Sequence, residues 1–263
     1  MIHKTIWITG ASSGLGETLA LAYAKEGVKL ILSALYLEKL QPIAQQCIEA
    51  GAEVFCLAFD ISIKEQVTLA AEKVLAKYKT IDLLINNAGI GQRSLAIETS
   101  NEVENQIIDT NFWSAVWLTK AVLPSMILNK QGHIAVVSSI SGLFSFPNRS
   151  AYSASKHALM GYFESLSIEL AKSNICVTLI CPGRMNNDFS LEALTAKGEK
   201  YGKMDASHTN GVPLNDACKM ILNAIKRKKR YLVFGKKEIF LWYIKRFHAE
   251  WFYKVASRIS PGS

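Results

Sequence analysis

Three side chains in the middle of the sequence have the types and the order needed to move a proton to or from a carbonyl oxygen. Tyr152 and Lys156 are four positions apart in a segment, residues 151–171, whose pattern predicts a helix. They therefore lie on one helix face, one turn apart. Ser139 follows an apolar run, residues 133–137, that predicts a buried strand. Ligands of open α/β sheets bind at the carboxyl ends of strands, where this serine is expected.

A glycine-rich turn, Thr9-Gly-Ala-Ser-Ser-Gly-Leu-Gly16, could hold the phosphates of a dinucleotide. It connects a predicted strand at 4–9 to a predicted helix at 15–26. Glycine allows a tight turn and close approach of a phosphate, and the helix N-terminus offers free N–H groups and the positive end of its dipole. The spacing G-x3-G-x-G differs from the G-x-G-x-x-G fingerprint. Taken alone, the motif is equally compatible with a structural turn.

Strands and helices alternate along the chain, and several strands are continuously apolar, as in a sheet covered on both faces. The pattern predicts one α/β domain over 1–263 with a doubly wound, Rossmann-like parallel sheet. We expect strands at 4–9, 28–34, 53–59, 81–86, 132–138, 175–181 and 230–234, and helices at 15–26, 37–50, 62–78, 101–128, 151–171, 215–228 and in the C-terminal tail.

Composition fits this architecture. The chain has 263 residues, of which 49% are hydrophobic, a size that suits a single domain with a substantial core. Its five cysteines have no metal or thioredoxin-type spacing, so we expect reduced thiols and no metal site. We expect no signal peptide and no membrane-spanning segment, and hence a cytoplasmic protein.

Together these motifs resemble the short-chain dehydrogenase/reductase family, from Thr9 to about Asn223. The match includes Asp60 after the third strand, Asn86-Asn-Ala-Gly89 after the fourth, Asn111 in a helix, and Pro182-Gly183 after the sixth. The resemblance implies an NAD(P)(H)-dependent oxidoreductase that transfers hydride between the nicotinamide and a carbonyl or secondary alcohol. It also implies that Ser139, Tyr152 and Lys156 are catalytic.

The family resemblance implies a role for each catalytic residue. Tyr152 is the general acid or base, and because a free phenol has a pKa of about 10, Lys156 is expected to lower that pKa. Lys156 also binds the nicotinamide ribose. Ser139 orients the substrate oxygen. Asn111 positions a water that relays protons from Lys156, although a polar residue in a solvated helix kink is the alternative.

The resemblance also implies a set of cofactor-binding residues. Asn187 stands where the family usually has a threonine that contacts the nicotinamide amide, and an asparagine can make a similar hydrogen bond. The implied set is Gly10, Ser12, Ser13, Gly14, Leu15, Gly16, Ser33, Asp60, Ile61, Asn87, Ala88, Gly89, Tyr152, Lys156, Pro182, Gly183, Met185 and Asn187.

The second strand ends without the usual cofactor signal. Members of the family that use NAD usually have an acid where this chain has Ala34, and members that use NADP usually have a basic residue where it has Leu35. Without the acid, a 2′-phosphate is not repelled, and Ser13 and Ser33 could donate hydrogen bonds to it. The expected cofactor is NADP(H), with NAD(H) as the alternative.

The C-terminal extension, residues 236–258, carries the substrate information. The chain lacks the Val-Asp-Gly-Gly type of ending found in 3-oxoacyl carrier-protein reductases, and its tail resembles that of hydroxysteroid dehydrogenases and related reductases. We expect a lipophilic substrate, steroid-like or long-chain, with a 3-oxoacyl thioester as the alternative.

The extension is predicted to be amphipathic, aromatic and basic, and three interpretations stay open. It could pack on its own domain or on a dimer partner, or cover the substrate as a lid. It could also lie on a membrane with its cations facing anionic lipid. The basic run at 226–230 is taken as a solvated helix end rather than a nucleic-acid site. The cations in question are Lys236, Lys237, Lys245, Arg246, Lys254 and Arg258.

Two further expectations concern assembly and activity. The helices at 101–128 and 151–171 pair subunits in much of this family, so a homodimer is expected, with a tetramer as the alternative. The polar stretch at 188–210 is expected to be the substrate loop, either a flap that orders on binding or a disordered surface loop. A non-catalytic nucleotide-binding scaffold is the rival function, and the intact catalytic set argues against it.

Overall fold

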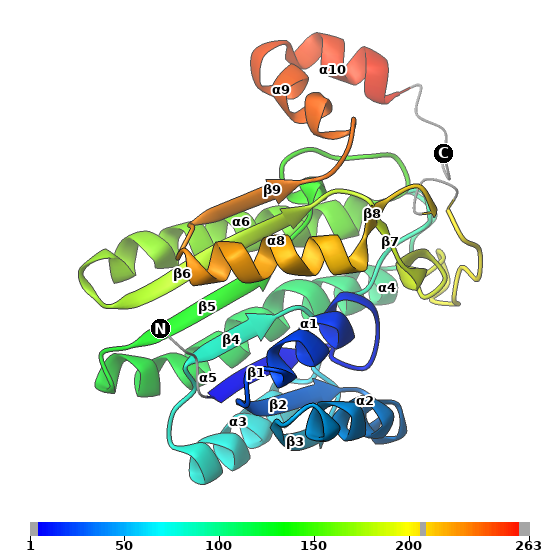
Figure 1. The fold of residues 1–263 in the computed structure, drawn as a ribbon. Helices are drawn as coiled ribbons and strands as arrows, with labels where there is room; N and C mark the ends of the chain where they lie inside the picture. The colour runs from blue at the N-terminus through cyan, green and yellow to red at the C-terminus, as the bar shows by residue number, and fades with distance from the viewer. Residues whose placement is uncertain (1–4, 206–208, 258–263) are drawn as a thin grey trace.

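The computed structural model describes residues 5–205 and 209–257, and these contain a seven-stranded parallel sheet. Its order is β3-β2-β1-β4-β5-β6-β9 (Figure 1). The chain runs outward from β1 to β3 and then crosses back to β4, which confirms the doubly wound sheet. The strands are β1 (Thr5–Thr9), β2 (Lys29–Ala34), β3 (Glu53–Ala58), β4 (Leu83–Asn86), β5 (Gly132–Val137), β6 (Ile175–Pro182) and β9 (Tyr231–Phe234).

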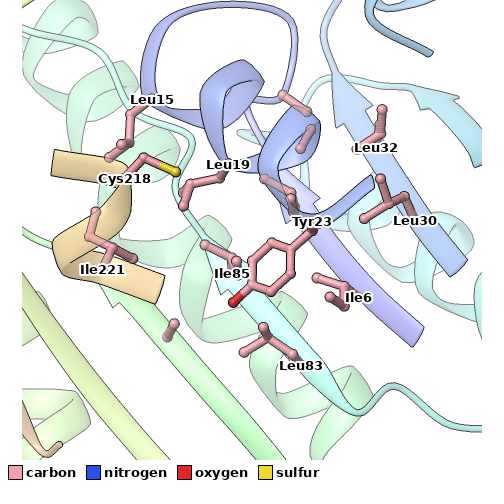
Figure 2. Close-up of a cluster of buried hydrophobic side chains, with 14 of the residues drawn as sticks. Ile6, Leu15, Leu19, Tyr23, Leu30, Leu32, Leu83, Ile85, Cys218 and Ile221 are labelled. Carbon is pink, nitrogen blue, oxygen red and sulfur yellow. The ribbon is translucent and has the colours of Figure 1, made fainter. Parts of the chain in front are cut away.

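Helices cover both faces of the sheet. Successive strand residues point to opposite faces, so Ile6 and Ile8 pack under one helical layer while Trp7 packs under the other. Figure 2 shows Leu19 and Tyr23 of the first layer beside these strands. The first layer is α1 (Gly14–Ala24), α2 (Leu37–Glu49) and α8 (Leu214–Lys226), and the second is α3 (Lys64–Tyr78), α5 (Ser114–Leu128) and α6 (Ser150–Glu169).

The helix predicted over 101–128 has a wider turn in its middle. It begins as α4 (Asn101–Ile108), passes through one π-helical turn at Asp109–Trp113 and continues as α5. A π turn inserts one extra residue, and such turns are frequent at functional sites. Here the turn buries the Asn111 side chain, which is 1% exposed, in the direction of β4.

Part of the predicted substrate loop packs against the protein. Two strands absent from the prediction, β7 (Met185–Asn186) and β8 (Val212–Pro213), pair in parallel, and Asp188–Ser190 forms a 3-10 turn. Leu194 is buried and pairs with Gln92. Apolar residues in this otherwise polar stretch account for the packing. Residues 206–208 of the predicted loop lie outside the described residues.

The C-terminal extension forms two helices instead of one. They are α9 (Ile239–Phe247) and α10 (Ala249–Ala256), which meet at His248, whose φ of −144° interrupts the helix. Beyond β9 they project from the sheet edge (Figure 1). Phe252, 3% exposed, packs with Phe144 and Phe146. The extension therefore packs on its own domain through α10, and Arg258 lies outside the described residues. None of the helices in the described part of the chain combines the length and hydropathy needed to cross a bilayer.

Candidate active site

A cleft of about 840 Å³ opens at the carboxyl edge of the sheet, where β1, β2, β4, β5 and β6 end. Every predicted site residue except Gly16 and Asn111 lines it. Those two lie behind its wall and shape it from there. Within the described residues, no group of three or more His, Cys, Asp or Glu side chains is arranged to hold a metal ion.

The glycine-rich turn has the backbone that its sequence predicts. Gly10 and Gly14 have φ values of +63° and +57°, in the left-handed region that favours glycine. A Cβ added at Gly16 would lie 2.1 Å from the Gly10 carbonyl oxygen, so only glycine fits there. Ser13 precedes α1, is exposed, and makes no capping hydrogen bond of its own. The turn is therefore a narrow cradle at a helix N-terminus, which suits a phosphate group.

Thr9 ties this turn to the segment after β4, a role that sequence reasoning missed. Its buried hydroxyl accepts hydrogen bonds from the backbone N–H groups of Asn87 and Ala88, both at 3.0 Å, and donates to the Ile85 carbonyl at 3.4 Å. The Asn87 side chain in turn donates to the carbonyls of Thr9 and Gly10, at 2.9 and 3.3 Å. These hydrogen bonds hold the glycine-rich turn after β1 and the segment after β4 together.

A cation that was not predicted from the end of the second strand, Lys39, lines the cleft beyond β2. Ser33, 2% exposed, already accepts a hydrogen bond from Trp7 Nε1 at 3.0 Å, which leaves Ser13 as the more accessible of the two serines. Lys39, in the first turn of α2, lines the same cleft, with its Nζ 5.5 Å from the centre of the Tyr36 ring. Its position inside a helix explains why the residues that end the strand did not reveal it.

Ser139, Tyr152 and Lys156 converge on the cleft as predicted. All three are buried, at 9%, 9% and 4% exposure. Ser139 follows β5, and its hydroxyl accepts a hydrogen bond from the Ser141 N–H at 3.1 Å. The Lys156 ammonium donates to the Val137 carbonyl at 2.9 Å and lies 5.7 Å from the centre of the Tyr152 ring.

Gln92 anchors the backbone of the tyrosine. It is fully buried, its Oε1 accepts from the Tyr152 N–H at 3.2 Å, and its Nε2 donates to Ser150 Oγ at 3.2 Å. The first turn of α6, which carries Tyr152, is thus tied to the segment after β4. Sequence reasoning missed this positioning residue because Gln92 and Tyr152 lie 60 positions apart.

Burial shifts the pKa values of both titratable groups toward their neutral forms. It raises the pKa of Tyr152, while a hydrogen bond with Ser139 and the charges of Arg149 and Arg93 oppose the rise. Burial also lowers the pKa of Lys156 to about 8. The lowering of the Tyr152 pKa expected from Lys156 is therefore not the net effect of the protein environment, because burial is the largest contribution and the ammonium is turned toward the Val137 carbonyl.

Asn111 is hydrogen-bonded to the strand end rather than solvated. Its Oδ1 accepts from the Ile90 N–H at 2.7 Å, and its Nδ2 donates to the Ile90 carbonyl and to Ser155 Oγ, both at 3.0 Å. A Cβ added at Gly89 would lie 3.0 Å from Asn111 Oδ1 and 3.5 Å from Lys156 Nζ. Asn111 and Lys156 thus approach the same glycine from two helices, which agrees with the neighbourhood expected for the pair.

The segment after β6 closes the far side of the cleft. The Gly183 N–H donates to the Phe234 carbonyl, and a Cβ there would lie 2.9 Å from the Gly235 Cα, so a larger residue would push the two backbone segments apart. Asn187 accepts a hydrogen bond from the Phe189 N–H at 3.3 Å through Oδ1. Its amide N–H groups remain suited to an acceptor in the cleft, on which Asn187 also borders.

Arginine side chains occupy the end of the cleft beside Tyr152, a feature absent from the sequence prediction. Arg93, after β4, and Arg149, just before α6, both line the cleft and share one carboxylate, that of Asp205. Arg93 and Asp205 are separated by 112 positions. No periodic pattern indicates such a contact between two non-helical segments.

Comparisons with known proteins agree with this geometry. The model of the short chain dehydrogenase family matches residues 4–197. The dehydrogenase/reductase SDR family protein 7-like of Anopheles gambiae is 43% identical over 232 residues, covering 86% of this chain and 73% of the relative. A metagenomic short-chain oxidoreductase solved in complex with NADP has a TM-score of 0.73 and 26% identity, covering 89% of this chain and 98% of that one. A short chain dehydrogenase/reductase from Burkholderia phymatum, solved with NAD, has a TM-score of 0.82 over 99% and 97% of the two chains, and at 24% identity supports the fold alone.

Proposed function

The chain belongs to the short-chain dehydrogenase/reductase family, and from this premise we propose that it is an NADP(H)-dependent oxidoreductase acting on a carbonyl or secondary alcohol. The observation that carries the proposal is the convergence of Ser139, Tyr152 and Lys156 on one cleft with a phosphate cradle at its other end. A bound dinucleotide would supply or accept the hydride. The glycine turn fits it, because Gly10, Gly14 and Leu15 line the cleft at the N-terminus of α1, where free backbone N–H groups suit a pyrophosphate.

The protein's own part in the reaction is to hold the carbonyl and supply a proton. In reduction, Tyr152 donates its phenolic proton to the substrate oxygen, and the raised pKa keeps that proton available at neutral pH. The Ser139 hydroxyl donates a hydrogen bond to the same oxygen and stabilises its developing negative charge. Lys156 holds the ribose and contributes positive charge near Tyr152. Both amide N–H groups of Asn111 are donated to the protein, so Asn111 positions the water that relays protons to Lys156 through the second lone pair of its Oδ1.

The rival function, a non-catalytic scaffold, requires no such arrangement of acid, donor and cation. The test is direct. Purified protein should consume NADPH in the presence of lipophilic ketones and should regenerate it from the corresponding alcohols. Tight nucleotide binding without turnover on any ketone would favour the scaffold.

We favour NADP(H) over NAD(H) because the cleft offers a cation and a free hydroxyl where the adenosine ribose would lie. Ala34 provides no carboxylate to repel a 2′-phosphate. Ser13 is exposed and lines the cleft, and Lys39 and Ala34 line it as well. A phosphate held by an ammonium and a hydroxyl gains charge-assisted hydrogen bonds.

Replacing Lys39 by methionine tests this preference. We expect the dissociation constant for NADPH to rise by about five- to tenfold and that for NADH to stay within about twofold, because only NADPH carries the 2′-phosphate. Fluorescence titration of both nucleotides measures this. Lys73→Met, an exposed lysine on α3, is the matched control. Equal losses for both nucleotides, or tighter binding of NADH by the original protein, would overturn the assignment.

A lipophilic substrate is supported by the side chains around the catalytic group. Phe146, Phe189 and Ile140 line the cleft, and the Phe189 ring centre lies 5.9 Å from that of Tyr152. The extension packs behind this wall, because Phe252 contacts Phe144, whose ring packs against that of Phe146. A steroid-like or long-chain ketone is therefore the first substrate class to screen, and a 3-oxoacyl thioester is the second.

We also propose that the outer side of the extension contacts an anionic membrane. Phe240, Tyr243 and Phe247 recur at helical spacing on α9 and are 69%, 51% and 71% exposed. Lys236, Lys237, Arg246 and Lys254 are exposed around them. Such a face suits lipid insertion with flanking cations. Lys245, expected among the lipid-facing cations, instead donates to the Leu143 carbonyl at 3.0 Å and helps to hold the extension on its domain.

Vesicle sedimentation tests the membrane proposal. The protein should pellet with phosphatidylserine-containing vesicles at low salt, and the pelleted fraction should fall as salt rises, because screening weakens the attraction of exposed charges. The double variant Phe240→Ser/Phe247→Ser should lose pelleting, whereas Leu128→Ser, 84% exposed on α5, should not. The proposal would be wrong if the protein failed to pellet at every salt concentration tested, or if the double variant still pelleted.

A homodimer is the assembly we propose, through the helices α4, α5 and α6. Trp113 and Trp117 stack with ring centres 6.2 Å apart, and Trp113 is 41% exposed. Ile168 on α6 is 72% exposed. Large apolar groups of this kind are typical of helices that pair with a second copy.

A further inference from the structure

The end of the cleft beside Tyr152 contains more positive charge than its one buried carboxylate balances. The Arg93 and Arg149 side chains are 6% and 15% exposed, and the Asp205 side chain is 1% exposed. Both guanidinium groups contact the same atom, Asp205 Oδ2. Two cations on one carboxylate leave one positive charge in excess within a largely buried site.

Arg93 donates more hydrogen bonds to the protein than Arg149 does. Arg93 donates to Asp205 through Nε at 3.1 Å and through a second nitrogen, and to the Gln92 carbonyl at 2.7 Å. Arg149 donates to Asp205 through one nitrogen at 3.2 Å, and its guanidinium lies 5.6 Å from the centre of the Phe146 ring. Among the described residues, no acceptor contacts its remaining N–H groups. An arginine has five such donors, so Arg149 keeps most of its capacity for a ligand.

Within residues 5–205 and 209–257, the acidic side chains other than Asp205 that border this end of the cleft form no ion pair with Arg149. Glu192 lines the cleft but is exposed and pairs with Lys200 at 2.8 Å, and Asp188 is exposed. A third arginine, Arg184, also lines the cleft and is close enough to Arg149 to disfavour its charge. Burial and the charge of Arg93 together lower the pKa of Arg149 to about 10. Buried charges of one sign are costly unless a counter-charge accompanies them.

The same guanidinium groups lie near the proton donor. Arg149 is three positions before Tyr152 at the start of α6, and the charges of both Arg149 and Arg93 act on the Tyr152 hydroxyl. A group bound by Arg149 would therefore belong to the molecule whose carbonyl Tyr152 protonates. The planar guanidinium matches the oxygens of a carboxylate or a phosphate, with which it forms paired hydrogen bonds.

We propose that the substrate is an anionic lipophilic ketone or alcohol whose carboxylate or phosphate is bound by Arg149, with Arg93 and Asp205 holding that arginine in place. The proposal rests on the proposed oxidoreductase function and narrows its substrate class. Phe146 and Phe189 accommodate the apolar part of the molecule. The alternative role for this cluster is purely structural, joining the segments that carry Arg93, Arg149 and Asp205, and the experiment separates the two.

Three probes with the same alkyl chain and the same internal ketone provide the test, one neutral, one ending in a carboxylate and one in a phosphate monoester. We expect kcat/KM with NADPH to be at least about tenfold higher for one anionic probe than for the neutral one. Arg149→Met should lower kcat/KM for that anionic probe by about 10- to 100-fold and for the neutral probe by less than about threefold. The anionic probe with the higher kcat/KM shows whether Arg149 binds a carboxylate or a phosphate.

Three controls keep the result interpretable. Arg227→Met changes an exposed arginine after α8 and should leave kcat/KM unchanged for both the neutral and the anionic probes. Arg149→Lys should recover part of the preference, because it keeps the charge and loses the paired geometry. Assays in the reduction direction at pH 6.5 keep Tyr152 protonated, so a change in its pKa on losing Arg149 does not affect the comparison.

A binding measurement separates failure of this proposal from failure of the proposed function. Dodecyl phosphate, dodecanoate and dodecanol are titrated into the NADPH complex, with fluorescence of the nucleotide as the readout. We expect an anionic ligand to bind at least about tenfold more tightly than the alcohol, and Arg149→Met to abolish that difference. Equal binding of all three, or equal losses on neutral and anionic probes, would establish the structural role instead. Anion-selective binding without turnover of any probe would support the anion site and reject the oxidoreductase.

Discussion

Replacing Tyr152 by phenylalanine should lower kcat for ketone reduction by about 10²- to 10⁴-fold, because the variant lacks the proton donor. Affinity for NADPH should stay within about twofold. Phenylalanine keeps the ring that packs beside Phe189, so the fold and the cleft wall are preserved. Steady-state consumption of NADPH and a fluorescence titration of the nucleotide measure the two quantities on the same preparation.

Tyr78→Phe is the matched control for this variant. It removes a phenolic hydroxyl on α3 that contacts Glu53 at 3.2 Å, in an exposed position outside the cleft. Turnover should be unchanged in it. If Tyr152→Phe kept full activity, some other group would be delivering the proton and the proposed mechanism would be wrong.

The raised pKa of Tyr152 also predicts the pH dependence of the original enzyme. Reduction needs the protonated phenol, so its rate should be level through neutral pH and fall only in alkaline solution. Oxidation needs the phenolate and should rise with pH over the same range. The charges of Arg93 and Arg149 oppose the rise in the Tyr152 pKa. The pH at which reduction slows and oxidation speeds up is therefore closer to neutral than burial alone would make it.

Gly16→Ala should lower the free energy of unfolding by about 2–3 kcal/mol, although alanine is the better helix former. The added Cβ would lie 2.1 Å from the Gly10 carbonyl oxygen and 2.7 Å from Asn87 Nδ2, so the backbone of the turn must move. Because that turn is the phosphate cradle, NADPH affinity should fall by at least about tenfold as well. Urea denaturation and nucleotide titration check the two effects.

Gly161→Ala gives the opposite expectation on α6. A Cβ there meets nothing within 4 Å, so the usual preference of helices for alanine should stabilise the protein by about 0.5–1 kcal/mol. The two variants differ only in what surrounds the new methyl group. Finding Gly16→Ala as stable as Gly161→Ala would contradict the close packing of the turn.

The sheet, and the common location of Ser139, Tyr152 and Lys156 at its edge, could be predicted because each depends on local patterns. Both faces of β1 and β2 are buried, so their apolar runs identify them as central strands. The spacing of Tyr152 and Lys156 places both on one face of a helix once their segment is helical. The predicted strand bounds agree with the structure within two residues. Strand ends then place Ser139 and the glycine turn at a common edge.

What the sequence did not reveal depends on contacts between distant, irregular segments. The Arg93–Asp205 contact joins two loops, and Lys39 reaches the cleft from inside a helix. The π turn at Asn111 changes helical periodicity by one residue, which is too little to detect against the scatter of apolar positions. The break at His248 involves neither proline nor glycine, so no sequence signal marks it.

The hydroxyl of Thr9, which joins the glycine turn to residues 87 and 88, makes the nucleotide-binding surface a property of the assembled sheet. The strands it bridges, β1 and β4, are neighbours in the sheet but are separated along the chain by two strands and three helices. Bound nucleotide should therefore stabilise the long-range pairing of β1 with β4 by mass action, and not the first half of the domain alone. Ligand affinity and global cooperativity are coupled here, so the amount of folded enzyme in a cell should depend on its nucleotide pool.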